Sequence, residues 1–158
     1  MQVHPYRADD TASIARVFTD SVRSAAKDYS REQIAAWAPH PPDVEHWRAR
    51  LAARIGFVVE VEFPEGDAGE VAGFVTLEPD GHLDDLYVAT RFQRRGVAAM
   101  LYARVEQEAR ARNLTRIFTE ASITAQPFFE WVGFSVIAAQ TAKVRGISFT
   151  NYRMERFL

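Results

Sequence analysis

Apolar residues near the start of the chain recur at intervals of three and four, which is the spacing of one face of an α-helix. The recurring residues are Ile14, Val17, Phe18 and Val22. Asp9 or Asp10 stands just ahead of them and can cap the helix that they predict. Residues 3–7, before those aspartates, predict a short first strand.

Two further helices are predicted before the pattern changes. Residues 30–33 read Ser-Arg-Glu-Gln, which has the form of a capping box and predicts a helix over residues 30–38. Three prolines follow and end this helix. Residues 43–54 place Val44, Trp47 and Leu51 on one stripe, which predicts another helix.

The middle of the chain is rich in β-branched and aromatic residues, as strands are. Residues 57–63 and 71–77 predict the two strands of an antiparallel hairpin, joined by a turn at 64–69. Residues 79–81 read Pro-Asp-Gly and predict a tight turn. A third strand is predicted directly after it, over residues 82–88.

The second half alternates helices and strands. A helix is predicted over 96–112, a strand over 115–119, a helix over 127–132, and strands over 134–138 and 148–157. The order is therefore βααα-βββ-αβ-αββ. Strand–helix–strand units beside hairpins predict an α/β fold with a mixed sheet and helices packed on it. A length of 158 residues suits a single domain that spans the whole chain.

Composition narrows the function classes. The net charge of −2 leaves no global basic field, so we expect no nucleic-acid partner. The chain has no cysteine, which excludes disulfides and a thiol nucleophile. It starts without a basic-then-apolar leader, and no apolar run reaches the roughly 20 residues that span a bilayer. We therefore expect a cytoplasmic protein with no membrane partner.

The segment between the strand predicted at 82–88 and the helix predicted at 96–112 gives the clearest indication of a binding site. Residues 93–98 read Gln-Arg-Arg-Gly-Val-Ala and lead straight into the helix. The first turn of a helix has free N–H groups and a partial positive charge. Gly96 and Ala98 let a phosphate approach the backbone. This predicts a diphosphate site that needs no metal; the alternative is that Gly96 serves only the turn.

Residues 93–98 also match the Gln/Arg-x-x-Gly-x-Gly/Ala signature of the GNAT superfamily of N-acetyltransferases. Residues 125–134, Ala-Gln-Pro-Phe-Phe-Glu-Trp-Val-Gly-Phe, resemble the family's Ala-x-x-Phe-Tyr-Glu-x-x-Gly-Phe segment. Residues 83–88 resemble the strand that leads into the loop. The resemblance is strongest over 82–134, and residues 29–38 resemble a bacterial subgroup whose members are uncharacterised.

The resemblance implies a fold, a co-substrate and a reaction. The fold would be GNAT-like, with the fourth and fifth strands splayed apart so that unpaired backbone groups can hold an extended thioester. Acetyl-CoA would be the co-substrate, and its acetyl group would pass directly to the primary amine of a small molecule or peptide. The residues implied to bind acetyl-CoA are Leu86, Tyr87 and Val88 for the pantetheine arm, and Gln93, Arg94, Arg95, Gly96, Val97 and Ala98 for the diphosphate.

Two implied cofactor contacts depart from the family pattern. Ser122 stands where the family often has an asparagine, and it is shorter but can still hydrogen-bond. Phe129 stands where the family often has a tyrosine that protonates the leaving thiolate, and Phe129 has no proton to give. Either another residue or water must protonate the thiolate, or the thiolate leaves without a proton. The last route is feasible because a thiol with a pKa near 8.5 gives a tolerable leaving group.

His82 and Asp84 are the candidate catalytic residues. They lie two apart on a predicted strand, so their side chains share a face. They stand six and four residues before Val88, where some family members carry their base. His82, with an ordinary pKa near 6.5, could take the amine's proton, and Asp84 could attract the ammonium group. The alternative is an exposed histidine at a strand start beside a solvated acidic pair.

Tyr29 and Trp37 are the candidate substrate contacts, because the early helices cover the acceptor site in this family. The alternative is that both belong to the core. The remaining histidines show no metal-ligand spacing, so we expect no metal. The final strand, 148–157, could pair across a homodimer.

Two other functions stay open at this point. One is a non-catalytic acyl-CoA-binding or regulatory module on the same fold, since a fold does not fix a function. The other is a toxin that acetylates aminoacyl-tRNA. The net charge of −2 argues against the toxin, which needs a basic groove.

Overall fold

The computed structural model describes residues 1–64 and 68–158, and the elements follow the expected order. Residues 65–67, in the turn expected at 64–69, lie outside the described residues. The helices are α1 (Thr11–Arg23), α2 (Arg31–Trp37), α3 (Val44–Ala52), α4 (Val97–Ala111) and α5 (Gln126–Trp131), with short 3-10 helices η1 (Ala8–Asp10) and η2 (Thr90–Phe92). The strands are β1 (Gln2–Pro5), β2 (Ile55–Val61), β3 (Glu70–Leu77), β4 (Leu83–Val88), β5 (Arg116–Ser122), β6 (Ser135–Val144) and β7 (Ile147–Phe157).

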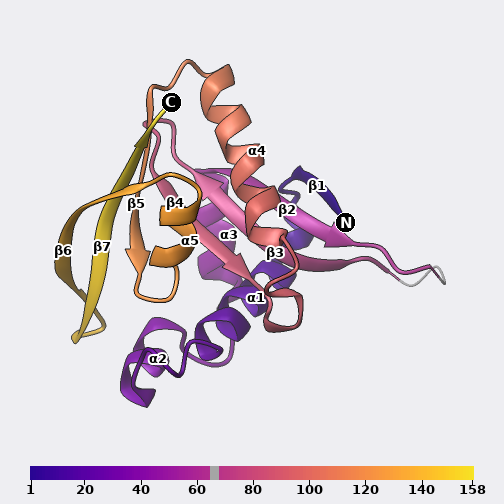
Figure 1. Cartoon of the computed structure of the whole chain (residues 1–158). Coiled ribbons are helices and arrows are strands. Elements are labelled where there is room, and N and C mark those ends of the chain that lie inside the picture. Colours follow the sequence, from indigo (N-terminus) through magenta and orange to yellow (C-terminus); the bar gives the residue numbers. More distant parts are fainter. Residues whose placement is uncertain (65–67) are drawn as a thin grey trace.

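The strands form two sheets that meet at a narrow junction. One sheet has the order β1-β2-β3-β4 and the other β5-β7-β6, and the ladders within each are antiparallel. Among the described residues, one isolated parallel bridge joins the two sheets, between His82, directly before β4, and Phe118 of β5. Beyond this bridge the two strands diverge (Figure 1). The α/β architecture with a splay between the fourth and fifth strands is confirmed.

Gly81 allows the two sheets to meet at this junction. Its backbone has φ +99°, a conformation that side chains with a Cβ rarely adopt. An added Cβ would also collide with the Arg116 carbonyl oxygen. The Gly81 carbonyl instead accepts a hydrogen bond from the Phe118 N–H at 3.1 Å. The Pro-Asp-Gly turn therefore fixes the point from which β4 and β5 separate.

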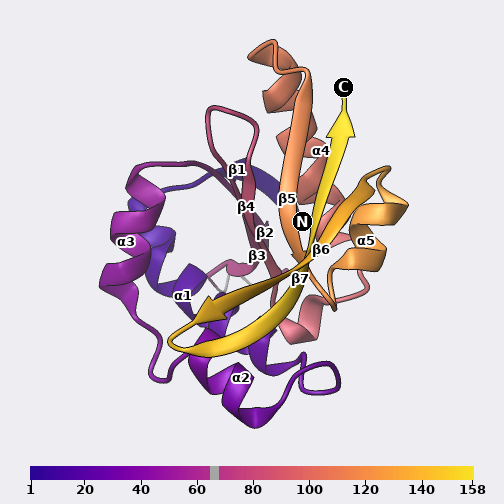
Figure 2. The same ribbon diagram turned by 90° about the vertical axis from the view of Figure 1, so that its left-hand side faces the viewer.

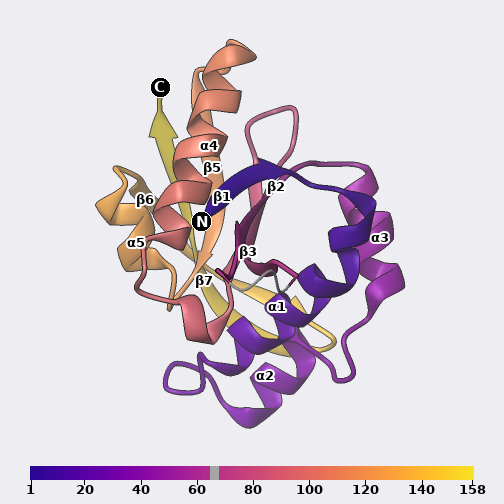
Figure 3. The same ribbon diagram turned by 90° about the vertical axis from the view of Figure 1, so that its right-hand side faces the viewer.

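Helices cover the first sheet from both sides. Figure 2 shows α1 and α3 on one face and α4 on the other, and Figure 3 shows the same arrangement from behind. A second, smaller cluster joins α2 to β7 through Ala25, Tyr29, Ala36 and Phe149. The predicted capping box is present: the Ser30 hydroxyl accepts from the Gln33 N–H at 3.1 Å, and the Ser30 N–H donates to the Gln33 side chain at 2.9 Å. In the described ranges no helix is long and apolar enough to cross a membrane.

The last hairpin differs from its prediction. Strand β6 runs to Val144, whereas the sequence analysis ended it at residue 138. Residues 139–143 are small or polar and lack apolar alternation, so their sequence gives no strand signal. Backbone pairing with β7 holds them in the sheet, and Arg145 and Gly146, both with positive φ, close the turn.

The expected pairing of the final strand across a dimer is wrong. Strand β7 lies in the middle of its sheet and is hydrogen-bonded to β5 on one side and β6 on the other. Residues 151–155 are paired on both sides, so this part of the strand offers no free backbone edge to a second copy.

Candidate functional site

The loop before α4 has the geometry of an anion site. Gly96 is the N-cap residue of α4, with φ +85°, and Arg94 also lies in the left-handed region, with φ +62°. A Cβ built on Gly96 would meet nothing within 4 Å, so the space in front of the helix is open. The N–H groups of Val97 and Ala98 belong to the first turn, where helical partners are lacking. Arg94 and Arg95 are exposed beside them.

Gln93 braces this loop against neighbouring elements. Its side-chain amide donates to the Val88 carbonyl at 3.2 Å and to the Ser24 hydroxyl at 3.0 Å. The loop is thereby tied both to the end of β4 and to the end of α1. A predicted cofactor contact is thus also the residue that holds the loop in place.

The backbone of β4 turns alternate groups toward the splay. The Ala89 N–H donates to the Ala72 carbonyl at 2.9 Å, so the Val88 carbonyl of the same peptide unit points the opposite way, away from β3. The Tyr87 carbonyl faces β3, where it lies 2.8 Å from the Cβ position of Gly73. Because backbone groups alternate along a strand, Leu86 faces the same side as Val88. Leu86 and Val88 therefore present their main chain to the splay, and Tyr87 presents its side chain to the pocket described next.

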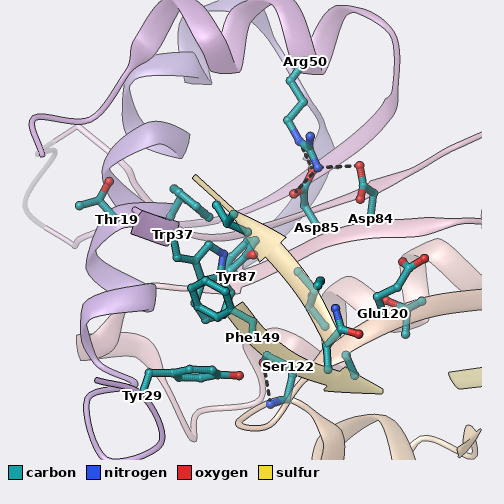
Figure 4. A pocket seen from close by; sticks show the side chains of 18 of the residues that line it. Thr19, Tyr29, Trp37, Arg50, Asp84, Asp85, Tyr87, Glu120, Ser122 and Phe149 are labelled. Atoms are coloured by element: carbon teal, nitrogen blue, oxygen red, sulfur yellow. Dashed lines mark hydrogen bonds and ion pairs between the residues drawn. The ribbon is translucent and has the colours of Figure 1, made fainter. Parts of the chain in front are cut away.

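A pocket of about 560 Å³ lies between β4, β5 and the early helices. This volume suits a small-molecule ligand. Seven of the predicted site residues line it: Tyr29, Trp37, Asp84, Leu86, Tyr87, Ser122 and Phe129. Figure 4 shows Tyr29, Trp37, Tyr87 and Phe149 on one side of it and Asp84, Asp85 and Glu120 on another. His82 and residues 93–98 do not contribute to this wall.

His82 lies behind the pocket wall between two carboxylates. Its Nε2 is 2.5 Å from Glu120 Oε2, and its Nδ1 is 2.8 Å from Glu78 Oε1. Carboxylates only accept hydrogen bonds, so the imidazole satisfies both when each ring nitrogen carries a proton. Burial lowers the pKa of His82, but the hydrogen bonds to Glu120 and Glu78 outweigh it and hold the pKa above its ordinary value. An ordinary pKa near 6.5 was expected for His82, because the residues beside it in the sequence do not reveal these carboxylate partners.

Two arginines hold Asp84 and Asp85: Arg50 in α3, and Arg54 just after the end of that helix. Arg50 donates to Asp84 at 2.6 Å and to both oxygens of Asp85 at 3.1 Å (Figure 4). Arg54 donates to Asp84 at 2.7 Å, and the Thr76 hydroxyl donates to Asp85 at 2.7 Å. Burial raises the pKa of the Asp85 carboxyl, and Arg50 opposes that shift. The alternative of a solvated acidic pair is therefore wrong, because both carboxylates belong to a paired, largely buried cluster.

Glu78, His82 and Asp84 place one ligand atom each within 4.8 Å of one another, as a metal site would require. The Arg54 guanidinium also lies here, 3.9 Å from Glu78 and 2.7 Å from Asp84. A positive charge at this place competes with a bound cation. Arginine and histidine therefore neutralise the carboxylates that a metal would need.

Comparisons with known proteins agree with this geometry. The family model "Acetyltransferase (GNAT) domain" matches residues 25–156. The chain belongs to the GNAT family of acetyltransferases. It is 31% identical over 156 residues to the uncharacterised N-acetyltransferase YafP of Escherichia coli K12, covering 98% of this chain and 94% of YafP.

Two solved GNAT-type structures illustrate the likeness in fold. A GCN5-related N-acetyltransferase of Rhodopseudomonas palustris superposes with a TM-score of 0.88 at 30% identity, covering 99% of this chain and 95% of that one. YncA of Salmonella typhimurium, solved with its cofactor acetyl-CoA, superposes with a TM-score of 0.72 at 17% identity, covering 99% and 93%. At that identity the second likeness concerns the fold alone.

Ser122 and Phe129, the two expected cofactor contacts beyond the loop, lie at the end of β5 and in α5. The Ser122 hydroxyl accepts from the Ala125 N–H at 3.1 Å, which begins the turn into α5. Phe129 is 3% exposed and its ring packs 5.1 Å from that of Phe134. The Tyr29 hydroxyl accepts from the Ile123 N–H at 2.8 Å, next to Ser122. Tyr29 is thus anchored at the end of β5 while also lining the pocket.

Several residues of the GNAT site were missed by sequence reasoning. Glu120 and Arg50 both line the pocket, and Glu78 and Arg54 lie behind it. Arg50 and Arg54 stand four apart at the end of a predicted helix, which places them on one helix face. That spacing signalled two neighbouring charges, but nothing in it signalled which carboxylates they would meet.

Proposed function

We propose that this acyltransferase moves the acetyl group of acetyl-CoA directly to the primary amine of a small molecule. The support is the adjacency of two features: a helix start with the geometry of an anion site and a partly acidic pocket, joined by the splayed strand β4. The bound acetyl-CoA of YncA, a protein of similar fold, supports the choice of donor. The volume of the pocket favours a small acceptor over a macromolecule.

Acetyl-CoA would lie along the splay. The N–H groups of Val97 and Ala98, together with Arg94 and Arg95, would hold the diphosphate at the start of α4, because the helix dipole and free N–H groups favour anions there. The main chain of Leu86 and Val88 would bond the pantetheine arm. Ser122 and Phe129 line the pocket and would meet the thioester end. Phe129 cannot protonate the thiolate, so the thiolate would leave unaided or take its proton from water.

His82 and Glu120 would carry the acceptor's proton. The Glu120 carboxylate reaches the pocket wall, and its contact with His82 and that of His82 with Glu78 form a line from the pocket to the surface. The amine would enter as an ammonium ion, lose a proton to Glu120 or water, and attack the thioester carbon as the neutral amine. His82 would pass the proton outward. Asp84 is already paired to two arginines, so the attraction of the ammonium group would come mainly from Glu120.

A broad screen of primary amines tests this function. Purified protein is mixed with acetyl-CoA and each amine, and the free thiol of CoA is measured. The proposal expects amine-dependent release of CoA and an N-acetylated product of matching mass. Acetyl-CoA binding without release for any amine would favour the non-catalytic module. Release with aminoacyl-tRNA alone, lost as salt is raised, would favour the toxin.

We also propose that the reaction runs in the cytoplasm without a metal ion. Arg54 and His82 already neutralise the carboxylates that a cation would use. Turnover should therefore be unchanged after dialysis against EDTA. A loss of turnover that zinc or magnesium restores would contradict the metal-free mechanism.

A further inference from the structure

One wall of the acceptor pocket consists of aromatic rings from four separate segments. The Trp37 ring lies 5.2 Å from that of Tyr29, 6.0 Å from that of Phe149 and 6.4 Å from that of Tyr87 (Figure 4). Trp37 and Tyr87 are only partly buried, and all four rings line the pocket. Ring surfaces of this kind bind flat apolar groups, and a further ring adds stacking to simple burial.

The pocket lining also offers hydrogen-bond acceptors. Glu120 stands on β5 with a side chain that is 41% exposed. Asn151, on β7, pairs with Ser122 of β5 and also lines the pocket. Its Oδ1 atom is buried and has no hydrogen-bond partner among the described residues. A buried acceptor without a donor costs free energy, which an N–H group of a ligand would recover.

The charges of the pocket favour a cation. Asp43, Asp84, Asp85 and Glu120 line it. Arg50 and Arg54 neutralise Asp84 and Asp85, whereas Asp43 and Glu120 have no arginine partner among the described residues. The Arg145 guanidinium is turned to the Ala36 carbonyl, to which it donates at 2.6 Å. A carboxylate or phosphate on the acceptor would therefore face the carboxylates of Asp43 and Glu120. A polyamine or a sugar would leave the aromatic wall facing polar groups that it cannot satisfy.

We infer that the acceptor is a primary amine that carries an aromatic ring, an arylalkylamine by chemical class. The ring would lie against Trp37 and Tyr87, and the ammonium group would point to Glu120 and the Asn151 oxygen. This inference rests on the proposed function, because it names the acceptor of that reaction.

The test compares matched amines at saturating acetyl-CoA. 2-Phenylethylamine and 2-cyclohexylethylamine have the same chain and nearly the same size, and spermidine and kanamycin represent the other classes. The kcat/KM of phenylethylamine should exceed that of cyclohexylethylamine about threefold or more, the value of one added aromatic contact. It should exceed those of spermidine and kanamycin by about a hundredfold.

Single substitutions test whether the preference for an aromatic amine arises in the pocket. Trp37→Leu should raise the KM for phenylethylamine about tenfold and leave that for propylamine unchanged, because propylamine has no ring to pack. Asn151→Leu should raise the KM for both amines, since it removes the acceptor that the amino group uses. Trp131→Leu is the matched control, because Trp131 is 73% exposed on α5 and does not line the pocket.

The outcomes separate this inference from the proposed function. Best turnover with spermidine or kanamycin, or an equal effect of Trp37→Leu on every amine, would overturn the inference and leave acetyl transfer standing. If no amine releases CoA, calorimetric titration of phenylethylamine into the protein decides whether the pocket binds this class of amine. Binding that Trp37→Leu weakens would sustain the ligand class and overturn the transfer, and absence of binding would overturn both.

Discussion

The two carboxylates beside His82 decide how this imidazole handles protons. His82 can pass on the acceptor's proton only when one of its ring nitrogens is unprotonated, and Glu120 and Glu78 raise the pKa of His82. Turnover should therefore rise with pH through a value above 6.5, the ordinary pKa of histidine. His82→Ala should lower kcat about a hundredfold without changing the affinity for acetyl-CoA.

Glu78→Gln should shift this pH profile. Glu78 contacts His82 but does not line the pocket, so its replacement removes a charge that favours the protonated imidazole. The acidic limb of kcat against pH should move to lower pH, with a smaller change in the maximum. Glu130→Gln, at an exposed position on α5, is the control that should leave the profile in place. An unmoved limb in Glu78→Gln would show that another group sets the profile.

Arg50 is the residue on which the stability of the pocket most depends. Asp85 is 4% exposed, and Arg50 is its charged partner among the described residues. Arg50→Leu would leave a buried carboxylate without its counter-charge and should lower the free energy of unfolding by about 3 kcal/mol. Arg48→Leu is the matched control on the same helix, since its pair with Glu45 is exposed. Arg48→Leu should change the free energy of unfolding, measured by chemical denaturation, by no more than about 0.5 kcal/mol. Equal losses of stability in the two variants would contradict this account.

At the scale of elements, the capping box of α2 fixes one side of the acceptor pocket. Ser30 and Gln33 satisfy each other's backbone N–H groups, and the Gln33 amide also donates to the Ser148 carbonyl of β7 at 3.0 Å. Ser30→Ala should lower the free energy of unfolding by about 1 kcal/mol. Because α2 carries Trp37, the KM for the acceptor should rise as well. Ser135→Ala, exposed at the start of β6, is the control, and the same loss there would argue against a capping effect.

At the same scale, local signals predicted most elements and failed where pairing is non-local. The capping box of residues 30–33 and the Pro-Asp-Gly turn at 79–81 are written in neighbouring residues, and both are as expected. The second half of β6 has no apolar alternation and is held by β7, so no local pattern revealed it. The place of β7 between β5 and β6 depends on strand order, which periodicity does not encode.

At the scale of the whole molecule, the site too has one part that local sequence predicts and one part that depends on distant residues. The loop at 93–98 could be predicted because one continuous segment builds it. The pocket could be predicted only in part, because it joins α1, α2, α3, α5, β4, β5, β6 and β7. His82 and Asp84 were chosen for their shared strand face, and the structure adds the partners that set their charge: Glu78 and Glu120 for one, Arg50 and Arg54 for the other. Such partners lie 30 or more positions away in three of the four cases, beyond the reach of any local motif.

The most direct test of the central claim is calorimetric titration of acetyl-CoA into the wild-type protein, Gly96→Asp and Gly146→Asp. Both glycines have positive φ, +85° and +78°, and open space at their Cβ positions, so the two substitutions impose a similar backbone strain. Only Gly96→Asp places a negative charge at the start of α4. We expect micromolar binding by the wild type and by Gly146→Asp, and loss of binding in a folded Gly96→Asp. Equal affinity of all three proteins would contradict the assignment of the acetyl-CoA site to this loop.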